Sequence, residues 1–410
     1  MNILFVHQNF PAQFKHIAPE LAKDAAHRVV ALTMRKDFPS QWEGVEVVPY
    51  SVDSIPKPNF NPWLSDFEVK SIRAEACFHA SAKLAKEGFT PDVIIAHPAW
   101  GESLFLKEVW PKAKLAIYCE FFYQSSGLDV GFDPEFLGIN PQDIHRFSFK
   151  NINNLMNMHI ADAAISPTQW QASTFPTEFQ KKITVIHDGI DTDIVRPNHD
   201  VNFDLSGVGT LSKNDEIITF VSRELEPYRG YHIFMRALPE LLKKRPKARV
   251  LIVGGDGVSY GKKPTNGSSW AETFAREVRP LMSDSEWSRV HFLGKIPYNR
   301  FLQVLQISTV HVYLTYPFVL SWSLLEAMST GCAIVASATG PVEEVITNEK
   351  TGLLCNFFDI NQLLTSVIRL LDDASLRKLL GDAARAKVIQ QYDLCTKSVP
   401  LQKKWIEQLA

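Results

Sequence analysis

The sequence predicts an α/β protein of two Rossmann-like domains that face each other across a deep cleft. With 410 residues, the chain exceeds the roughly 250 to 300 beyond which a single hydrophobic core usually stops growing. Short runs rich in β-branched residues alternate with helix-period segments, a pattern typical of parallel sheets covered by helices. A polar, turn-rich stretch at residues 196–215 interrupts this pattern, which then restarts. Two domains joined by a linker follow from these observations.

The first domain is expected at residues 1–197, completed by a C-terminal helix at residues 396–410. It opens with a βαβ unit whose helix carries an apolar stripe, because its apolar residues recur at the spacing of one helix face. That stripe consists of Phe14, Ile17, Ala18 and Leu21. The strands predicted for this domain are 2–6, 28–33, 92–96, 115–119, 163–166 and 183–186.

The second domain is expected at residues 198–395, with a helix at 231–245. The connection 254–270 is long and rich in Gly, Ser, Pro and Lys, so we expect a surface loop or flap. Parallel sheets bind ligands at the carboxyl ends of their strands, so the loops after these strands are the expected ligand-binding positions. The strands predicted for this domain are 216–221, 249–253, 290–293, 309–314 and 333–336.

The composition is that of an ordinary globular protein without a strong field of one sign. Apolar residues make up 45% and charged residues 21% of the chain, and 43 basic residues stand against 45 acidic ones. This balance argues against a nucleic-acid-binding protein. The five cysteines are odd in number and form no C-x-x-C pair, so we expect reduced core residues of a cytosolic protein.

The sequence gives no sign of a membrane span or a signal peptide. No stretch approaches the roughly 18 apolar residues that a span requires, and the amino terminus lacks a basic lead and a cleavage site. We expect a cytoplasmic protein that is at most peripheral to the inner face of a membrane.

Two arginines follow a predicted strand of the second domain at the end where ligands bind. Arg223 and Arg229 stand just after strand 216–221. A diphosphate needs fixed cations, and guanidinium supplies permanent charge with forked donors. The alternative is a pair of solvated arginines balanced by Glu224 and Glu226, and the spacing alone does not decide between the two.

The segment 321–328 is expected to begin a helix after the strand at 309–314. The free N–H groups of a helix amino end suit a phosphate. Ser323 and Glu326 also have the spacing of a capping box, in which Glu326 would only bond back to the cap.

Two further patterns favour turns over ligand sites. The run Gly-Gly-Asp-Gly at 254–257 lacks the spacing of a dinucleotide fingerprint and is explained as well by a tight turn, so a nicotinamide-dependent dehydrogenase is a weak alternative. The run Asp-Thr-Asp at 191–193 resembles a metal-binding motif but precedes the linker, where a turn and cap role is favoured. No cluster of His and Cys at metal-ligand spacing is present, and no metal site is predicted.

His97 and Glu120 stand at the ends of two predicted strands of the first domain. Both side chains are therefore expected to point into the cleft. A strand-end histidine is often only a structural group, and an exposed carboxylate is often only solvated. Two polar groups at the ends of these strands nevertheless favour a site.

Taken together, these segments resemble the retaining glycosyltransferases of family four (group 1), which have the two-domain GT-B architecture. Residues 183–191 are similar to the interdomain signature of the family, with Asp188 at the usual Asn. The segment Leu-Glu-Ala-Met at 325–328, followed by Gly331 and the strand 333–336, matches the most specific part of the pattern.

The resemblance implies roles for individual residues. Arg223 and Arg229 fall at the positions that hold the donor diphosphate, Glu326 at the position that binds the donor ribose, and residues 292–296 at a strand and turn that contact the base. The implied donor-binding set is Arg223, Arg229, Gly294, Lys295, Ile296, Phe318, Val319, Leu320, Ser321, Trp322 and Glu326. The implied catalytic set is His97, Glu120, Arg223 and Arg229.

Three positions depart from the family pattern. Phe318 stands where the family has its first acidic residue, so recognition of the sugar would depend on backbone N–H groups from Val319 to Trp322. Glu120 stands where the family has a His. Residues 9–13, Asn-Phe-Pro-Ala-Gln, replace a Gly-Gly loop after the first strand.

The expected function is transfer of a hexose from a nucleotide-diphosphate sugar, with a UDP-sugar such as UDP-glucose as the first choice. The acceptor would be a saccharide or a lipid-linked molecule, the configuration would be retained, and the pathway would be surface polysaccharide or glycoconjugate synthesis. Neither a metal ion nor a cofactor is expected, because the arginines and the helix start would stabilise the leaving diphosphate. The alternatives are a non-catalytic sugar-nucleotide-binding partner of another transferase and a sugar-nucleotide epimerase.

Overall fold

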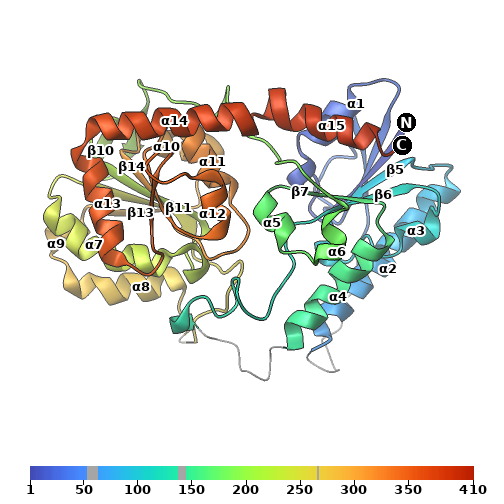
Figure 1. Cartoon of the computed structure of the whole chain (residues 1–410), viewed down its shortest axis with the longest axis horizontal. Helices are drawn as coiled ribbons and strands as arrows, with labels where there is room; N and C mark the ends of the chain where they lie inside the picture. Colours follow the sequence, from blue (N-terminus) through green and yellow to red (C-terminus); the bar gives the residue numbers. More distant parts are fainter. Residues whose placement is uncertain (53–62, 137–144, 266) are drawn as a thin grey trace. The chain divides into compact units, whose positions relative to one another are not determined.

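The computed structural model describes residues 1–52, 63–136, 145–265 and 267–410, which form two compact α/β units (Figure 1). The first unit contains residues 1–130, 145–189 and 394–410. The second contains residues 131–136, 190–265 and 267–393. The division after Gly189 precedes the predicted boundary at residue 197, and the sequence did not predict that residues 131–136 belong to the second unit.

An eight-stranded sheet organises the first unit, and its strand order is β3-β4-β2-β1-β5-β6-β7-β8. All neighbouring pairs are parallel except β3 with β4. The strands are β1 (Asn2–Val6), β2 (Arg28–Thr33), β3 (Gln41–Trp42), β4 (Val45–Pro49), β5 (Val93–Ala96), β6 (Lys114–Tyr118), β7 (Ala163–Ser166) and β8 (Ile183–Val185). The six predicted strands are confirmed to within about one residue, whereas the edge strand β3 and its neighbour β4 were missed.

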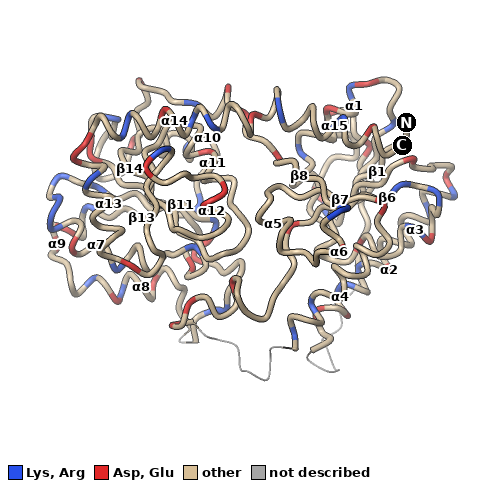
Figure 2. Tube along the Cα trace, in the orientation of Figure 1, with Lys and Arg blue, Asp and Glu red and all other residues tan. Residues whose placement is uncertain are grey.

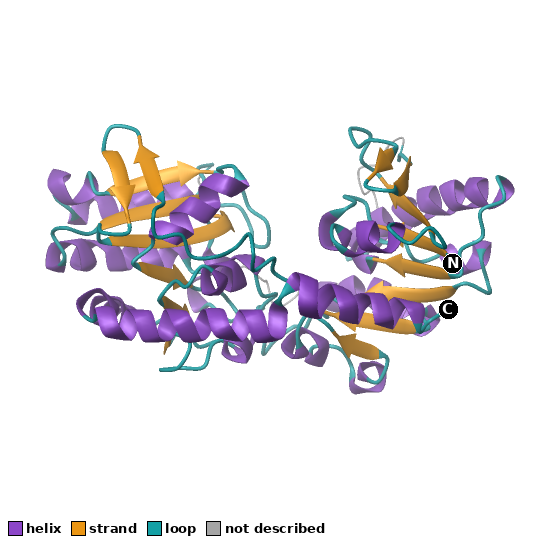
Figure 3. Ribbon diagram, turned by 90° about the horizontal axis from the view of Figure 1, so that it is seen from above, coloured by secondary structure: helices purple, strands orange, loops and turns teal. Residues whose placement is uncertain are grey.

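Helices cover both faces of this sheet (Figure 3). The central strand β1 shows why both faces are apolar, because Leu4 and Val6 enter one core cluster and Ile3 and Phe5 enter the other. The predicted stripe of the first helix is buried, but a short 3-10 turn (Ala12–Phe14) precedes the helix proper. The helices are α1 (Ile17–Ala22), α2 (Ser65–Lys86), α3 (Leu106–Val109), α4 (His145–Ile160), α5 (Gln169–Ser173), α6 (Thr177–Gln180) and α15 (Val399–Glu407).

A six-stranded, wholly parallel sheet organises the second unit, and its strand order is β13-β12-β11-β14-β15-β16. The strands are β11 (Ile217–Glu224), β12 (Arg249–Gly255), β13 (Val290–Gly294), β14 (Val310–Tyr313), β15 (Ile334–Ser337) and β16 (Leu353–Cys355). The five strands predicted here are confirmed with shifted ends, and β16 was missed. This is the strand order of the dinucleotide-binding Rossmann fold.

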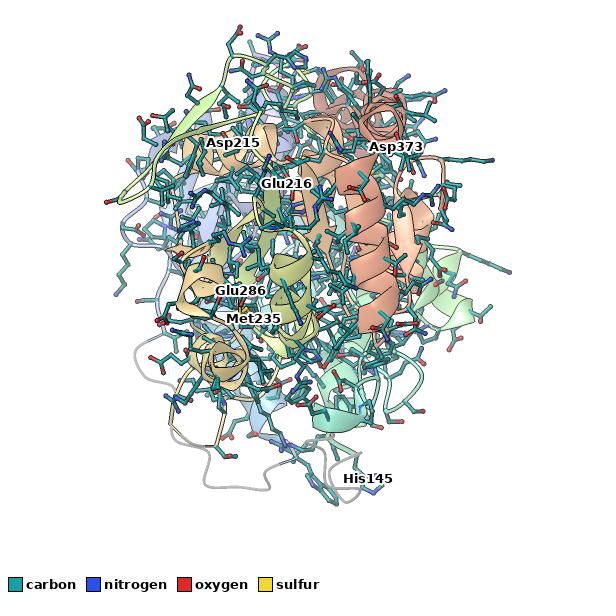
Figure 4. All side chains as sticks on the ribbon, turned by 90° about the vertical axis from the view of Figure 1, so that its left-hand side faces the viewer. His145, Asp215, Glu216, Met235, Glu286 and Asp373 are labelled. Carbon is teal, nitrogen blue, oxygen red and sulfur yellow. The ribbon has the colours of Figure 1, made fainter. Side chains whose placement is uncertain are left out.

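The helices of the second unit also lie on both sides of its sheet (Figures 1 and 3). Glu216, labelled in Figure 4, directly precedes β11. It forms a 2.7 Å ion pair with Arg245, which follows the helix α7 (Tyr231–Lys244). The helices are α7 (Tyr231–Lys244), α8 (Trp270–Val278), α9 (Asp284–Trp287), α10 (Tyr298–Ile307), α11 (Trp322–Ser329), α12 (Gly340–Val345), α13 (Ile360–Asp372) and α14 (Ala374–Tyr392).

The stretch predicted as a linker, residues 196–215, contains an antiparallel hairpin. Its strands are β9 (Asn202–Leu205) and β10 (Gly209–Ser212). The buried side chains of Phe203 and Leu211 join the core of the second unit. Of the turn residues that suggested a linker, Gly207 lies in the hairpin turn, with a φ of +75°, and Gly209 begins β10.

Each sheet has one switch point, where the strand order reverses direction. In the first unit it lies between β1 and β5, and in the second between β11 and β14. Ligands of open parallel sheets bind outside the carboxyl ends of the strands at such points. The loops after these four strands are therefore the parts of the fold to examine for a site.

Residues 131–136 pack on the second unit through two aromatic side chains. Phe132 contacts the rings of Tyr316 and Phe357, with centroid distances of 5.1 and 5.2 Å. Phe136 contacts the ring of Trp270 at 5.2 Å. This short segment therefore completes an aromatic cluster next to the loop that follows β14.

Charged residues of both signs are interspersed over both units (Figure 2). None of the described helices combines the length and the apolar character needed to cross a bilayer. The described cysteines are all free thiols, and Cys395 is the one among them that is exposed.

Candidate functional site

Arg229 is a buried charge at the switch point of the second unit. It ends a short helical turn (Pro227–Arg229) after β11. Its Nη1 donates to Thr315 Oγ1 (2.8 Å) and to the carbonyl oxygen of Val319 (3.1 Å), both in the loop after β14. Burial lowers the pKa of Arg229, but neighbouring phenol groups and Glu226 outweigh it and leave this pKa raised. A permanent cation is thus fixed between the loops that follow β11 and β14.

Arg223 differs from Arg229 because it is exposed. It lies near the carboxyl end of β11, and within the described residues its guanidinium forms no ion pair. The sequence left open whether both arginines are solvated and balanced by Glu224 and Glu226. Burial of Arg229 excludes that interpretation for Arg229, whereas the charge of Arg223 stays accessible to an anion.

The carboxylate of Glu224 is buried and binds two groups from other loops. Lys295 Nζ donates to Oε1 (2.5 Å) and the backbone N–H of Gly257 donates to Oε2 (2.9 Å). A Cβ at Gly255 would lie 2.3 Å from Glu224 Oε2. The glycine run at 254–257 thus makes room for this carboxylate, and its φ angles are not of the positive kind that demands glycine in a tight turn. Lys295, predicted to bind the donor, is paired with Glu224.

The loop after β14 contains the predicted donor-sugar positions. Phe318 is buried, with its ring 5.7 Å from that of Tyr228 and its N–H bonded to the carbonyl oxygen of Tyr316 (2.7 Å). Val319 is held by Arg229, and Leu320 packs against the core of the unit. A buried aromatic side chain, packed against Tyr228, therefore stands where the family pattern has a carboxylate.

Helix α11 begins at Trp322 with Ser321 as its cap. The Oγ of Ser321 accepts from the N–H of Ser323 (3.3 Å), and the N–H of Ser321 donates to the hydroxyl of Tyr313 (3.1 Å). The alternative interpretation of Ser323 and Glu326 as a capping box is therefore excluded. It failed because the chain enters the helix two residues earlier than the Ser-x-x-Glu spacing suggests.

Glu326 has a partner that the sequence did not indicate. The hydroxyl of Tyr298, at the start of α10, donates to Glu326 Oε1 (2.7 Å). Burial and the negative charge of Glu326 raise the pKa of Tyr298. Gly294 ends β13 with a φ of +64°, and Ile296 packs against the core of the unit. The turn at 294–296 directly precedes the helix α10, which begins at Tyr298.

Segment 131–136 also forms polar contacts with the loop after β14 and with the helix α7. The Asp133 carboxylate accepts from the hydroxyl of Tyr316 (2.8 Å) and lies 3.0 Å from His232 Nε2. Glu135 forms a two-pronged ion pair with Arg236 (2.6 and 2.7 Å). One ligand atom each of Asp133, Glu135 and His232 lies within 4.8 Å of the others, so the group could also hold a metal ion. Arg236 already occupies both oxygens of Glu135, which favours the structural role.

In the first unit, four rings meet at the switch point. His7 follows β1, and its ring lies 5.1 Å from that of His97 and 4.9 Å from that of Trp100. His97 follows β5 and stacks on Tyr118 of β6 at 5.2 Å. Burial lowers the pKa of His7 to about 4, although a hydrogen bond with Gln13 opposes the shift. Sequence reasoning missed His7, although its place directly after a strand was the available signal.

His97 and Glu120 lie close together, as the sequence predicted. His97 Nδ1 accepts from the N–H of Ala99 (3.3 Å), which puts the ring proton on Nε2, 3.9 Å from Glu120 Oε2. That Nε2 has no hydrogen-bond partner among the described residues. Burial, reinforced by His7, holds the pKa of His97 well below its usual value. The site therefore combines a neutral buried donor with a partly exposed carboxylate.

Asp188, the departure within the interdomain signature, receives a hydrogen bond. The hydroxyl of Tyr118 lies 3.0 Å from both of its carboxylate oxygens. This pair and the residues around it line a small, mainly apolar cavity beside α15. Asp188 thus belongs to the same buried group as His97 through the ring of Tyr118.

Helix α4 holds the two loops that carry His97 and Glu120. The side chain of Asn151 bonds to both backbone groups of Tyr123 (3.0 and 2.6 Å), and that of Asn153 donates to the carbonyl oxygen of Pro98 (2.6 Å). The buried asparagines of this helix are Asn151, Asn153, Asn154 and Asn157. Their helical spacing was the signal, since asparagine rarely occupies a buried helix face without a partner.

The run at 191–193 forms a turn, as expected. Asp191 Oδ1 accepts from the N–H groups of Asp193 (3.1 Å) and Ile194 (3.0 Å), and Thr192 donates to Asp393 (2.6 Å). These contacts agree with a cap role for Asp191.

Two family models match consecutive parts of the chain. Residues 25–195 match the model described as glycosyl transferase family 4 group, and residues 205–387 match the model described as glycosyl transferases group 1. Together the two matches span most of both units.

Curated relatives match over shorter stretches. The chain is 28% identical over 209 residues to a D-inositol 3-phosphate glycosyltransferase of Corynebacterium efficiens, a match that covers 50% of this chain and 46% of the relative. It is 26% identical over 176 residues to a glycogen synthase of Mycobacterium tuberculosis, covering 43% and 39%. The chain thus spans about half the length or less of the curated relatives it matches.

Solved structures share the fold over the whole chain. Sucrose-phosphate synthase from Thermosynechococcus elongatus superimposes with a TM-score of 0.71 at 18% identity, covering 100% of this chain and 99% of that one. HepE from Anabaena, in complex with UDP and glucose, gives a TM-score of 0.70 at 17% identity, covering 100% of both. At these identities the similarity shows the fold.

The contacts of Asp133 predict a pH-dependent contribution to stability. Burial alone would raise its pKa, but the adjacent His232 and the hydrogen bond from Tyr316 outweigh burial and hold this pKa below its usual value. A lowered pKa means that the carboxylate stabilises the fold above about pH 4 and loses this effect as the pH falls through the folded-state value. Asp133→Asn should therefore cost about 1.5 kcal/mol or more in the free energy of unfolding at pH 7, and the difference from the parent should shrink below about pH 4.

Denaturant unfolding of both proteins at a series of pH values would measure this difference. Glu135→Gln is the matched control, because its ion pair is partly exposed and Arg236 also binds Glu277. We expect it to cost at most about 1 kcal/mol. An Asp133→Asn difference that stays constant from pH 7 to pH 3.5 would show that the carboxylate charge is not what stabilises this segment.

Proposed function

Since the chain belongs to the group 1 glycosyltransferases of family 4, we propose that it transfers a sugar from a nucleotide-diphosphate donor to an acceptor hydroxyl. The donor binds the second unit and the acceptor binds the first. Both roles follow the family pattern and agree with the polar groups at the two switch points.

The observation that carries this proposal is the pair of arginines at the switch point of the second unit. Arg229 is a preformed cation whose orientation is fixed by Thr315 and Val319. Arg223 adds an exposed cation from the end of β11, the strand that Arg229 follows. A diphosphate is a ligand of matching charge, and donors that are already oriented lose little entropy on binding it.

We propose a UDP-sugar, with UDP-glucose first, as the donor. HepE from Anabaena, which shares the fold, has been solved with UDP-glucose. The acceptor is a saccharide or a lipid-linked molecule, and surface polysaccharide or glycoconjugate synthesis is the expected context. The related D-inositol 3-phosphate glycosyltransferase and glycogen synthase indicate that acceptors vary within this group.

In the proposed reaction, the bond between the anomeric carbon and the phosphate oxygen breaks as the acceptor oxygen bonds to that carbon. The nucleoside diphosphate leaves with the bonding electrons, and its phosphate oxygen takes the acceptor proton. Arg223, Arg229 and the amino end of α11 stabilise the charge that develops on the leaving group. We propose that this stabilisation needs no metal ion and that the configuration of the sugar is retained.

A non-catalytic sugar-nucleotide-binding role is the second candidate. Phe318 favours it, because a buried aromatic side chain replaces a carboxylate that the family pattern has near the donor sugar. Such a protein would bind the donor without turning it over.

The proposed activity can be tested with the purified protein and a panel of nucleotide sugars. A donor present at 100 times its dissociation constant should add about 2.7 kcal/mol to the free energy of unfolding, which raises the melting temperature. Donors that stabilise the protein are then assayed for release of the nucleoside diphosphate with saccharide and lipid-linked acceptors.

Two outcomes of this assay decide between the candidates. Turnover that persists in excess chelator supports a metal-independent transferase, whereas activity that disappears and returns with a divalent ion contradicts metal independence. Stabilisation by a donor without turnover on any acceptor class would favour the non-catalytic role.

Arg223→Ala should weaken the binding of UDP by roughly ten- to hundredfold, because a hydrogen bond to a charged group contributes about 1.5 to 3 kcal/mol. Arg223 is exposed, so the fold should be little affected. Titration calorimetry would measure the affinity. Arg276→Ala, at an exposed arginine of α8, is the control and should bind UDP like the parent. Equal affinities in both variants would remove Arg223 from the donor site.

Glu120→Gln should lower turnover by roughly a hundredfold while leaving donor affinity nearly unchanged. The carboxylate is positioned to accept a hydrogen bond from an acceptor hydroxyl, and glutamine keeps its size but removes its charge. Steady-state kinetics with donor and acceptor varied separately would show a loss in kcat. Glu178→Gln, at the short helix α6 of the same unit, serves as the control. A parental rate in Glu120→Gln would mean that Glu120 is only a solvated strand-end carboxylate.

A further inference from the structure

The connection between β12 and α8 is held down by two buried carboxylates. Glu224 accepts from the N–H of Gly257 (2.9 Å). Glu226 accepts from three consecutive N–H groups, those of Ser259 (3.2 Å), Tyr260 (3.3 Å) and Gly261 (3.3 Å). Both carboxylates come from the segment at the end of β11, where Arg223 and Arg229 also lie. The sequence predicted this connection as a surface loop or flap, and the structure shows that its first part is fastened to the switch point.

Glu226 is suited to fix the loop rather than to bind solvent or substrate. Its side chain is almost wholly enclosed, at 1% exposure. Burial raises the pKa of Glu226, although the three N–H groups and Arg229 favour the charged form. If the loop moved, the buried carboxylate of Glu226 would lose one or more of these hydrogen bonds without gaining water in their place. The hydrogen bonds therefore strongly specify the conformation of the loop.

This geometry puts the ring of Tyr260 over Arg229. The guanidinium carbon of Arg229 lies 5.1 Å from the centroid of the Tyr260 ring. Tyr260 also meets Phe318 edge to face at a centroid distance of 4.9 Å, and the ring of Tyr228 lies 6.1 Å away. Phe318 and Arg229 are buried, whereas Tyr260 keeps about a third of its surface exposed, at 36%. Of these three side chains, that of Tyr260 is therefore the most accessible to a ligand.

The two neighbours of Tyr260 point to different parts of a donor. In the proposed function, Arg229 binds the diphosphate, and Phe318 occupies the position next to the donor sugar. A residue that touches both lies where the sugar joins the diphosphate. Sugar rings have an apolar C–H face that packs on aromatic rings, and aromatic side chains commonly line small-molecule sites.

We propose that Tyr260 is a donor-contacting residue at the junction of sugar and diphosphate, and that Glu226 is the residue that positions it. The Tyr260–Phe318 pair then recognises the donor sugar by ring packing in place of the carboxylate that the family pattern has at position 318. The proposal rests on the proposed function, because it assumes a nucleotide-sugar donor on the second unit.

The experiment compares the affinities for UDP-glucose and for UDP by calorimetry, and then kcat and KM for the donor. In Tyr260→Ala, the affinity for UDP-glucose should fall by about tenfold or more, and that for UDP by much less, so the ratio of the two affinities should fall. Tyr260→Phe keeps the ring and should bind UDP-glucose within about threefold of the parent. Lys263→Ala, at an exposed position of the same loop, should behave like the parent.

Glu226→Gln tests the positioning role. It should lower the same ratio, and adding Tyr260→Ala to it should lower the ratio no further, because both changes remove one contact. A merely structural role for Glu226 would weaken UDP and UDP-glucose equally and would add to the effect of Tyr260→Ala. That result would overturn the positioning role.

The failure of this inference differs from the failure of the proposed function. Parental affinity for UDP-glucose in Tyr260→Ala, beside a loss in Arg223→Ala, would overturn the role of Tyr260 and leave the donor site in place. A parent protein that binds neither UDP-glucose nor UDP would overturn the Tyr260 inference together with the proposed UDP-sugar donor.

Discussion

Arg229 places a permanent charge inside the second unit, and the loops around it are arranged to offset the cost of burying that charge. A guanidinium removed from water must be paired or hydrogen-bonded. Here Thr315 and the carbonyl oxygen of Val319 supply those hydrogen bonds from the loop after β14, and the negative charge of Glu226 helps to keep the pKa of Arg229 raised. The same carboxylate fastens the β12–α8 connection through three N–H groups. Arg229 and Glu226, three residues apart, therefore connect the end of β11 to the loop after β14 and to the β12–α8 connection.

In the first unit, neutral polar rings are buried next to a carboxylate. His97 is kept uncharged by burial, with its Nδ1 bound to a backbone N–H and its Nε2 directed toward Glu120. The asparagines of α4 fix the loops on either side by bonding their backbone groups. The loops that carry His97 and Glu120 are thus held by amide side chains. A neutral donor and an adjacent carboxylate suit a hydroxyl ligand as well as the arginines of the second unit suit a diphosphate.

Sequence reasoning succeeded where one residue's position along a strand or helix was enough. The strands β1, β2 and β7 have the predicted ends, and His97 and Glu120 lie together because both follow strands of one parallel sheet. Sequence reasoning failed where one local pattern is compatible with two different structures. The turn residues of 196–215 suggested a linker but close a hairpin, and the Ser-x-x-Glu spacing suggested a cap that Ser321 provides instead.

By itself, the sequence determined the α/β class, the two sheets and the arginines at a strand end, because strand periodicity and residue chemistry are local properties. Only the tertiary structure decided that Arg229 is buried while Arg223 is exposed, that Lys295 pairs with Glu224, and that Asp133 binds Tyr316 from 183 residues away along the chain. The placement of Tyr260 over Arg229 belongs to the same group. These contacts join residues that are distant in sequence. The packing of helices, strands and loops against one another decides which polar groups are buried, and buried polar groups need hydrogen-bond partners that local spacing does not reveal.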